Sequence, residues 1–364
     1  MKELIYLLAL KNIKGIGDAF ARRLLKSLGS PESVFNSSFE NLLEIEGINH
    51  TLAKSIKEFS DWNSVRKEAE FIYKKGIKIV KYTDSHYPVN LKSIYNYPLF
   101  LYYVGDIKSE DDKALAVVGS RDCDDYGIKI TERVVSKLSE KGITVVSGLA
   151  RGIDTAAHQS ALRSNGRTVA VLGNGIDICY PSENKELFKR ISESGYVLSE
   201  YPIGAKPESK NFPKRNRLIS GLSLGVLVIQ ANKNSGALIT ADYSNEQNRE
   251  VFTIPGNIDN KRNYGSNQLI KKGAKLVDNI DDIVDEIREF KTLTDKTIQK
   301  KADCKNITGE EKIVFQQLLE SKLHIDQIVY KTNIDFIRLF SLLLNMEMKG
   351  IVKSFPGNYY QAVK

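Results

Sequence analysis

The sequence predicts an α/β protein built on a doubly wound, mostly parallel β-sheet, with a smaller helical region at each end. Between residues 76 and 289, short apolar runs alternate with segments of helical periodicity, and this alternation is typical of consecutive βαβ units. Most of the runs are apolar at every position, which indicates strands covered by helices on both faces. We expect strands at 114–118, 144–146, 168–172, 196–198, 225–229 and 251–254, and helices at 126–140, 154–164, 184–193 and 237–248.

Three further regions flank this central part. Residues 1–75 have helical periodicity and contain a short repeat, since 12–17 and the weaker copy 44–49 each precede an expected helix. Residues 290–306 have little apolar content and form a predicted linker. Residues 307–364 contain three expected helices, at 309–320, 324–332 and 335–349, and two short strands, at 351–354 and 359–363. This order predicts a winged helix-turn-helix.

The composition describes an ordinary globular chain with a modest positive charge. The 53 Lys and Arg against 45 Asp and Glu give a net charge of +8, which favours polyanionic partners in general. The three cysteines are widely spaced and form no CxxC pair, so we expect neither disulfides nor a metal site. The apolar stretch Leu4–Leu10 is too short to span a membrane. We therefore expect a cytoplasmic protein that is neither exported nor membrane-spanning.

Three expected strands end in glycine-rich turns, at 117–121, 145–154 and 171–177. In an open parallel sheet, ligands bind at the carboxyl ends of strands, where glycine lets an anion approach the backbone. Arginine in such turns can grip phosphate through paired N–H groups. The candidate residues are Ser120, Arg121, Ser147, Gly148, Arg151 and Gly152. The competing interpretation is that glycine serves only the geometry of tight turns.

A basic segment at 210–217 supplies a second group of candidates. It contains four cations in eight residues, together with an aromatic ring, and suits a phosphate backbone with stacked bases. The candidates are Lys210, Phe212, Lys214, Arg215, Asn216 and Arg217. The alternative is the solvated start of a helix, although cations there oppose the helix dipole.

Several enzyme classes lack their signatures. The chain has no GxxxxGK[ST] and no GxGxxG after the first central strand. Ser147, Asp154 and His158 could form a triad, but Ser147 is not set in a GxSxG turn. Asp154 is more simply the cap or the first-turn acid of its helix, and His158 a partly buried packing residue. We therefore expect no catalytic residues, no cofactor and no enzymatic activity.

Seven segments in order make the central region resemble the DNA-processing protein A (DprA/Smf) family. They are 118–121, 147–154 with His158, 173–177 with Tyr180-Pro181, 199–202, 212–217, 235–240 and 249–256. The resemblance implies an extended Rossmann-like domain that binds single-stranded DNA, usually as a homodimer through that domain. It also implies that the protein protects incoming single strands during natural transformation and helps to load the RecA recombinase. By this resemblance Arg121, Arg151 and residues 210–217 line the DNA pocket, with the backbones of Gly148 and Gly152.

The flanking regions fit the same family. Residues 1–75 resemble a SAM-like or helix-hairpin-helix module, in which Gly15 and Gly17 are candidates for a secondary DNA contact. The second copy has Asn49 where glycine is expected, and the alternative is a purely structural helical bundle. The expected helix 335–349 is mostly apolar, which favours a protein-contact or regulatory role for the winged helix over reading DNA.

The resulting hypothesis is sequence-nonspecific binding of single strands, with about four phosphates neutralised and a salt slope near −3. The main rival is a phosphoribohydrolase-like enzyme that binds a nucleotide at the same sheet edge, although its PGGxGT signature is absent. A third reading is a winged-helix regulator of duplex operators. That reading predicts binding of one duplex sequence in preference to single strands.

Overall fold

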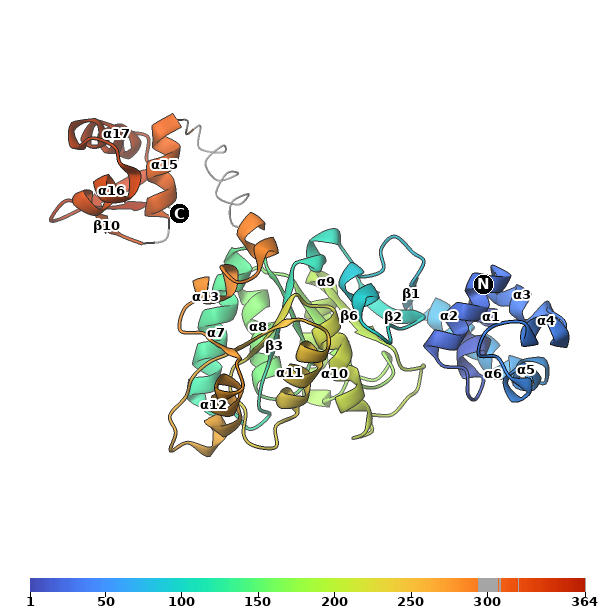
Figure 1. Ribbon diagram of the computed structural model, residues 1–364. Coiled ribbons are helices and arrows are strands. Elements are labelled where there is room, and N and C mark those ends of the chain that lie inside the picture. Colours follow the sequence, from blue (N-terminus) through green and yellow to red (C-terminus); the bar gives the residue numbers. More distant parts are fainter. Residues whose placement is uncertain (294–306, 308, 320, 364) are drawn as a thin grey trace. The chain divides into compact units, whose positions relative to one another are not determined.

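The computed structural model describes residues 1–293, 307, 309–319 and 321–363 (Figure 1). The chain divides into two compact units, Met1–Phe290 and Lys291–Lys364. Most of the predicted linker, residues 294–306, lies outside the described residues. Among the helices that the structure describes, none combines the length and the apolar character that a membrane crossing requires.

A nine-stranded sheet forms the centre of the first unit. Its strand order is β1-β2-β6-β5-β4-β3-β7-β8-β9. All pairs from β6 to β9 in this order are parallel, whereas β2 is antiparallel to both β1 and β6. The mostly parallel α/β prediction is therefore confirmed. The strands are β1 (Lys78–Lys81), β2 (Phe100–Gly105), β3 (Ala114–Val118), β4 (Thr144–Ser147), β5 (Thr168–Leu172), β6 (Tyr196–Ser199), β7 (Gly225–Val228), β8 (Glu250–Thr253) and β9 (Lys275–Leu276).

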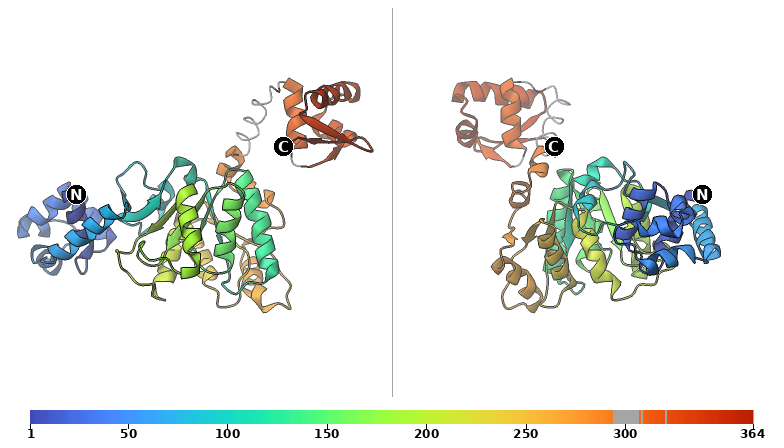
Figure 2. Two further views of the ribbon diagram at one scale, coloured as in Figure 1. Left: turned by 180° about the vertical axis from the view of Figure 1, so that it is seen from behind. Right: turned by 45° about the vertical axis from the view of Figure 1, so that its right-hand side comes forward.

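Helices cover both faces of this sheet (Figures 1 and 2). On one face α7 (Asp125–Glu140), α8 (Ile153–Arg163) and α9 (Lys185–Ser194) pack in sequence order. On the other lie α10 (Asn211–Gly221) and α11 (Gly236–Glu246). Alternate residues of β5 divide between the two hydrophobic clusters, as expected for a strand buried on both sides. Two short helices, α12 (Tyr264–Lys271) and α13 (Asp281–Val284), complete this part.

The order of the strands reverses at β3. From β3 the chain adds β4, β5 and β6 on one side, and β7, β8 and β9 on the other. At such a switch point the loops after neighbouring strands lead to opposite faces of the sheet and leave a crevice. The carboxyl ends of β3, β4 and β7 are therefore the place to look for a ligand site.

Six helices precede the sheet: α1 (Lys2–Asn12), α2 (Asp18–Leu28), α3 (Pro31–Asn36), α4 (Phe39–Leu43), α5 (His50–Lys57) and α6 (Trp62–Lys74). The α1–α2 and α4–α5 hairpins correspond to the repeat in the sequence, and each turns at a glycine with positive φ, Gly15 at 90° and Gly47 at 84°. Asn49 caps α5, because its Oδ1 accepts the Leu52 N–H at 3.0 Å. These helices share one hydrophobic cluster with Phe100 and Tyr102 of β2.

The second unit is a winged helix, as expected. It contains α15 (Gly309–Leu318), β10 (Leu323–His324), α16 (Ile325–Thr332), α17 (Phe336–Met348), β11 (Val352–Phe355) and β12 (Tyr359–Ala362). The strands pair in the order β10-β12-β11. Helix α17 buries Leu339 and Leu343, but its solvent side is also apolar, with Ile337 76% and Met348 83% exposed.

Candidate nucleic-acid interface

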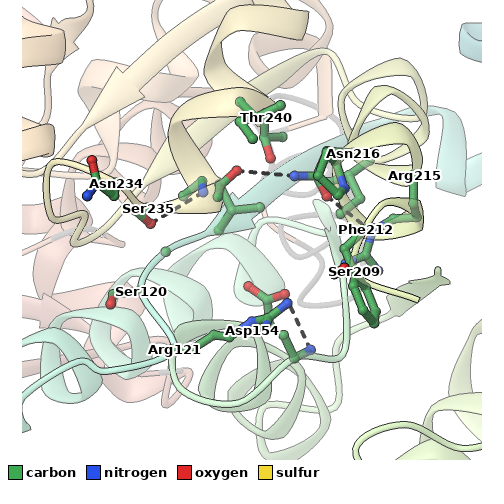
Figure 3. A pocket seen from close by; sticks show the side chains of 18 of the residues that line it. Ser120, Arg121, Asp154, Ser209, Phe212, Arg215, Asn216, Asn234, Ser235 and Thr240 are labelled. Carbon is green, nitrogen blue, oxygen red and sulfur yellow. Dashed lines mark hydrogen bonds between the residues drawn. The ribbon is translucent and has the colours of Figure 1, made fainter. Parts of the chain in front are cut away.

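A pocket of about 590 Å³ opens at the switch point of the sheet (Figure 3). Its walls come from the loops after β3, β4 and β5, the segment between β6 and α10, the first turns of α10, and the loop after β7 with the start of α11. The polar and aromatic lining residues include Ser120, Arg121, Asp154, Tyr180, Ser209, Phe212, Arg215, Asn216, Asn232, Asn234, Ser235 and Thr240. The loops that the sequence singled out after β3 and β4 thus meet the basic segment 210–217.

Arg121 is the exposed cation of this pocket. Its guanidinium carbon lies 5.3 Å from the centroid of the Phe212 ring, and it makes no hydrogen bond or ion pair to any residue that the structure describes. Ser120 fixes the loop beneath it, since its backbone N–H donates to the Gln230 carbonyl at 2.7 Å and its Oγ accepts the Asp122 N–H at 3.1 Å. The loop is therefore held while the Arg121 side chain remains available to a ligand.

Arg215 lies in the floor of the pocket and is only 3% exposed. Its Nη1 donates to the carbonyls of Gly148, at 2.9 Å, and Val171, and its Nε donates to Asn216 Oδ1 at 3.2 Å. Burial lowers the pKa of Arg215 to about 10, and the nearby Asp154 carboxylate opposes this shift. Arg215 is therefore charged at neutral pH, and its Nη1 joins the loop after β4 and the end of strand β5 to α10.

The glycines of these loops make room for side chains of α10. A Cβ at Gly148 would lie 2.6 Å from Arg215 Nη2, and one at Gly173 would lie 2.8 Å from Cδ1 of Phe212. The Phe212 ring also faces the Tyr180 ring at 5.6 Å. Close packing, and not the approach of an anion, explains these two glycines.

Ser147 and Gly152 are occupied within the fold. The buried Ser147 hydroxyl donates to the Val117 carbonyl at 2.7 Å. Gly152 has a φ of 74°, and a Cβ there would lie 2.3 Å from the Ser120 carbonyl oxygen, so the loops after β3 and β4 touch at this glycine. Neither residue lines the pocket.

Of the other expected cations, Arg151 lies at the edge of the pocket and three others lie outside it. Arg151 lines a small adjoining recess with Arg121 and Gly148, but it also pairs with Glu183, and this hydrogen bond lowers the pKa of Glu183. Three cations of 210–217 are absent from both linings: Lys210, which pairs with Glu208 at 2.7 Å, the exposed Lys214, and Arg217, which pairs with Glu200. Gly15 and Gly17 lie on the α1–α2 hairpin, also outside the pocket.

Sequence reasoning missed the wall formed by the start of α11. Ser235 is the N-cap of this helix, and its Oγ accepts the Ala237 N–H at 3.3 Å. The first amides of α11 border the pocket, where the helix dipole favours an anion. Thr240, only 1% exposed, lines the pocket one turn further along. The sequence Asn-Ser-Gly at 234–236, which follows a strand and precedes a helix, could have indicated this wall, but we looked only for cations.

The catalytic triad is absent from the geometry. His158 is fully buried, and its Nδ1 contacts Thr168 Oγ1 at 2.7 Å. Burial lowers the pKa of His158 to about 3, and Asp154 accepts the N–H groups of Gly148 and Ala150 at 3.2 and 3.4 Å. Ser147 also interacts with the Asp154 carboxylate, but the His158 ring is bonded to Thr168 and to neither of them. The described part of the chain contains no group of three or more His, Cys, Asp or Glu placed to hold a metal ion.

Comparisons with known proteins agree on one family. The model for DNA recombination-mediator protein A matches residues 78–288, a SAM-like helix-hairpin-helix tandem matches 7–60, and the DprA winged helix domain matches 300–358. Protein Smf of Synechocystis is 35% identical over 99% of this chain and 98% of its own length.

Two solved structures are similar across the sheet. The DNA processing protein A structure from Streptococcus pneumoniae has a TM-score of 0.66 and 34% identity, covering 79% of this chain and 98% of that one. The structure that describes the single-stranded-DNA binding mode of DNA processing protein A from Helicobacter pylori has a TM-score of 0.53 and 27% identity, covering 58% and 96%.

Proposed function

Because the chain belongs to the DNA recombination-mediator protein A (DprA/Smf) family, we propose that it binds single-stranded DNA in the pocket at the switch point of its sheet. The proposal rests most on one observation: Arg121 makes no hydrogen bond or ion pair to a described residue and lies beside the Phe212 ring in that pocket. A guanidinium without an acidic partner, next to a half-buried aromatic ring that lines the pocket, suits a phosphate followed by a stacked base. The Helicobacter pylori relative, whose structure concerns single-stranded DNA, supports the same ligand.

The pocket offers more than one place for phosphate oxygens. Arg121 supplies one, and the Gly236 N–H at the start of α11 supplies a second, neutral one, since the Ala237 and Leu238 N–H groups already bond to Ser235. Arg151 supplies a third after it leaves Glu183, a surface partner that it can exchange for a phosphate. Arg215 contributes its positive charge from below. Such contacts address the backbone, so binding tolerates any base sequence.

The cellular role follows from the family. We include in the proposal that the protein protects incoming single strands, helps to load RecA, forms a homodimer through the sheet domain and acts in the cytoplasm without catalysis. Family membership is the support for each of these points. Co-precipitation of purified RecA in the presence and absence of a single-stranded oligonucleotide tests the partner, and sedimentation equilibrium tests the dimer.

Fluorescence anisotropy of labelled dT20 and dA20 at several salt concentrations tests the binding site. We expect Arg121→Gln to weaken both oligonucleotides by about tenfold and to reduce the salt slope by about 0.7, the contribution of one phosphate on a single strand. The matched control is Arg163→Gln, which removes an exposed arginine of α8 that pairs with Glu132. Equal binding by Arg121→Gln and the parent protein, with the same slope, would exclude this pocket.

The rival enzymatic function predicts a different result. A phosphoribohydrolase-like protein would release free base from nucleoside monophosphates, which chromatography of the reaction mixture detects. His158 is buried and bonded to Thr168, and the carboxylate of Asp154, although it lines the pocket, accepts the backbone N–H groups of Gly148 and Ala150. We expect no free base. Its release at a rate abolished by a pocket substitution would replace the binding proposal.

A further inference from the structure

Arg217 was expected to hold a phosphate, but its side chain leaves α10 away from the pocket. It pairs with Glu200, and its Nη1 donates to the Asn96 carbonyl at 2.8 Å. The side chains of Arg217 and Glu200 are only 16% and 11% exposed. A buried pair of this kind fixes the position of the elements that carry it, because either charge left alone in the interior is costly.

Helix α10 carries the residues that line the pocket on one side and Arg217 on the other. Phe212 and Arg215 lie in its first two turns (Figure 3). Arg217 follows Arg215 by two residues, so within a rigid helix a shift at Arg217 also moves the Phe212 ring. The Arg217–Glu200 pair therefore fixes the pocket from outside it.

Asn96, whose carbonyl accepts a hydrogen bond from Arg217, belongs to a segment that also contacts the N-terminal helices. We name residues 96–99 the junction segment. The Leu99 N–H donates to Asp18 Oδ1 at 3.0 Å, and Arg22 donates to the Tyr97 carbonyl while its guanidinium lies 3.7 Å from the Tyr97 ring centroid. Asp18 and Arg22 are in the first turns of α2, directly after the turn that joins α1 to α2. Four consecutive residues thus contact α2 at one end and α10 at the other.

A second link runs through charge. Lys11 Nζ, at the end of α1, lies 3.6 Å from Asp18 Oδ1. The side chains of Lys11 and Asp18 are 23% and 15% exposed, so solvent screens this pair only in part. Lys11 and Asp18 also act electrostatically on Glu200. Charges of the hairpin therefore influence the acid that holds Arg217.

We infer that Arg217 is a positioning residue that couples the α1–α2 hairpin to the pocket through Glu200, the junction segment and α10. This inference rests on the proposed function, since its readout is single-stranded-DNA binding. It makes Arg217 a residue that binds no phosphate and yet sets the affinity. It also gives the N-terminal helices a part in DNA binding that requires no DNA contact of their own.

Glu200→Gln separates positioning from direct contact. If Arg217 gripped DNA, loss of a neighbouring negative charge would leave binding of the polyanion unchanged or strengthen it. Positioning predicts that Glu200→Gln weakens dT20 binding by about 5- to 20-fold, a usual size for coupling between sites, with the salt slope unchanged. Arg217→Gln should behave in the same way, whereas loss of a phosphate contact would reduce the slope by about 0.7.

Two further measurements keep the inference testable if a variant folds poorly. Arg217→Lys keeps a charge for a phosphate but cannot bond Glu200 and the Asn96 carbonyl with the same planar fork, so we expect it to weaken binding about as much as Glu200→Gln. In the parent protein, coupling is reciprocal. Bound dT20 should therefore slow hydrogen exchange of the Leu99 amide, which is bonded to Asp18, and Arg163→Gln should leave that effect intact.

The outcomes distinguish the two proposals. If the parent protein does not bind dT20, the proposed function fails. If the parent binds and Glu200→Gln and Arg217→Lys bind equally well, or if Arg217→Gln lowers the salt slope, the positioning role is wrong. Unchanged exchange at Leu99 on DNA binding would remove the link to the hairpin.

Discussion

Two arginines of the pocket have different environments, and the difference decides what their substitution reports. Arg121 is exposed and makes no hydrogen bond or ion pair to a described residue, whereas Arg215 is buried and donates to the carbonyls of Gly148, in the loop after β4, and Val171, in β5. Sequence reasoning grouped them because both are cations near strand ends. Only the structure separates a side chain that can bind a ligand from one that builds the site.

Replacing Arg215 by alanine should therefore damage the fold. The change leaves Asp154 buried without its cation and the carbonyls of Gly148 and Val171 without their donor. We expect a loss of about 3–5 kcal/mol in the free energy of unfolding, the usual result of breaking a buried charge pair. Urea unfolding followed by far-ultraviolet circular dichroism measures it.

Arg121→Ala is the matched control for that measurement. Removing an exposed side chain that makes no hydrogen bond or ion pair to a described residue should change the free energy of unfolding by no more than about 0.5 kcal/mol. A loss below about 1 kcal/mol in Arg215→Ala would show that Arg215 is not a structural centre. Weaker DNA binding in an Arg121/Arg215 double variant cannot identify two phosphate contacts, because one of the two changes acts on the loops.

At the scale of elements, the loop after β5 shapes the pocket without lining it with a charge. Gly173 lies against the Phe212 ring, and its φ is outside the left-handed region. An alanine there keeps the backbone conformation but places a methyl group 2.8 Å from Cδ1 of the ring. The ring must move, and with it the surface on which we propose that a base stacks.

We expect Gly173→Ala to weaken dT20 binding by about fivefold, a part of the 1–3 kcal/mol that a stacked base contributes. The salt slope should remain unchanged, because no phosphate contact is lost. Arg163→Gln is again the control, since this exposed arginine of α8 pairs with Glu132 outside the pocket. Tight binding by Gly173→Ala would argue that Phe212 stacks no base.

The periodicity of the sequence predicted the central elements closely, because a strand buried on both faces is apolar throughout. The run 114–118 coincides with β3, and 168–172 coincides with β5. Strands β1, β2 and β9 were not predicted. The edge strand β1 has two apolar residues between two lysines, the edge strand β9 has only two residues, and β2 lies at the end of an aromatic segment. Short edge strands have little pattern of their own.

The site was predictable as a place but not as a set of partners. Strand ends and glycine turns indicated where the pocket lies, and Arg121 and Phe212 do meet there. Ion pairing over long sequence separations could not be read from the chain. Glu200 pairs with Arg217 and Glu183 pairs with Arg151. The spacing of these residues in the sequence does not predict either pair.

At the scale of the whole chain, the pocket draws all its lining residues from 118–240, and Met1–Phe290 is compact, with buried side chains up to Phe290 itself. A chain ending at residue 290 should therefore bind dT20 within about twofold of the full-length affinity, with the same salt slope, because the phosphate contacts that set the slope remain.

The apolar solvent side of α17 carries few cations that could bind a duplex. We therefore expect the chain that ends at residue 290 to prefer single strands over duplex as strongly as the full chain does. Anisotropy with matched single-stranded and duplex 20-mers measures both quantities, and a tenfold weaker single-strand affinity in the shortened chain would assign DNA contacts to the winged helix instead.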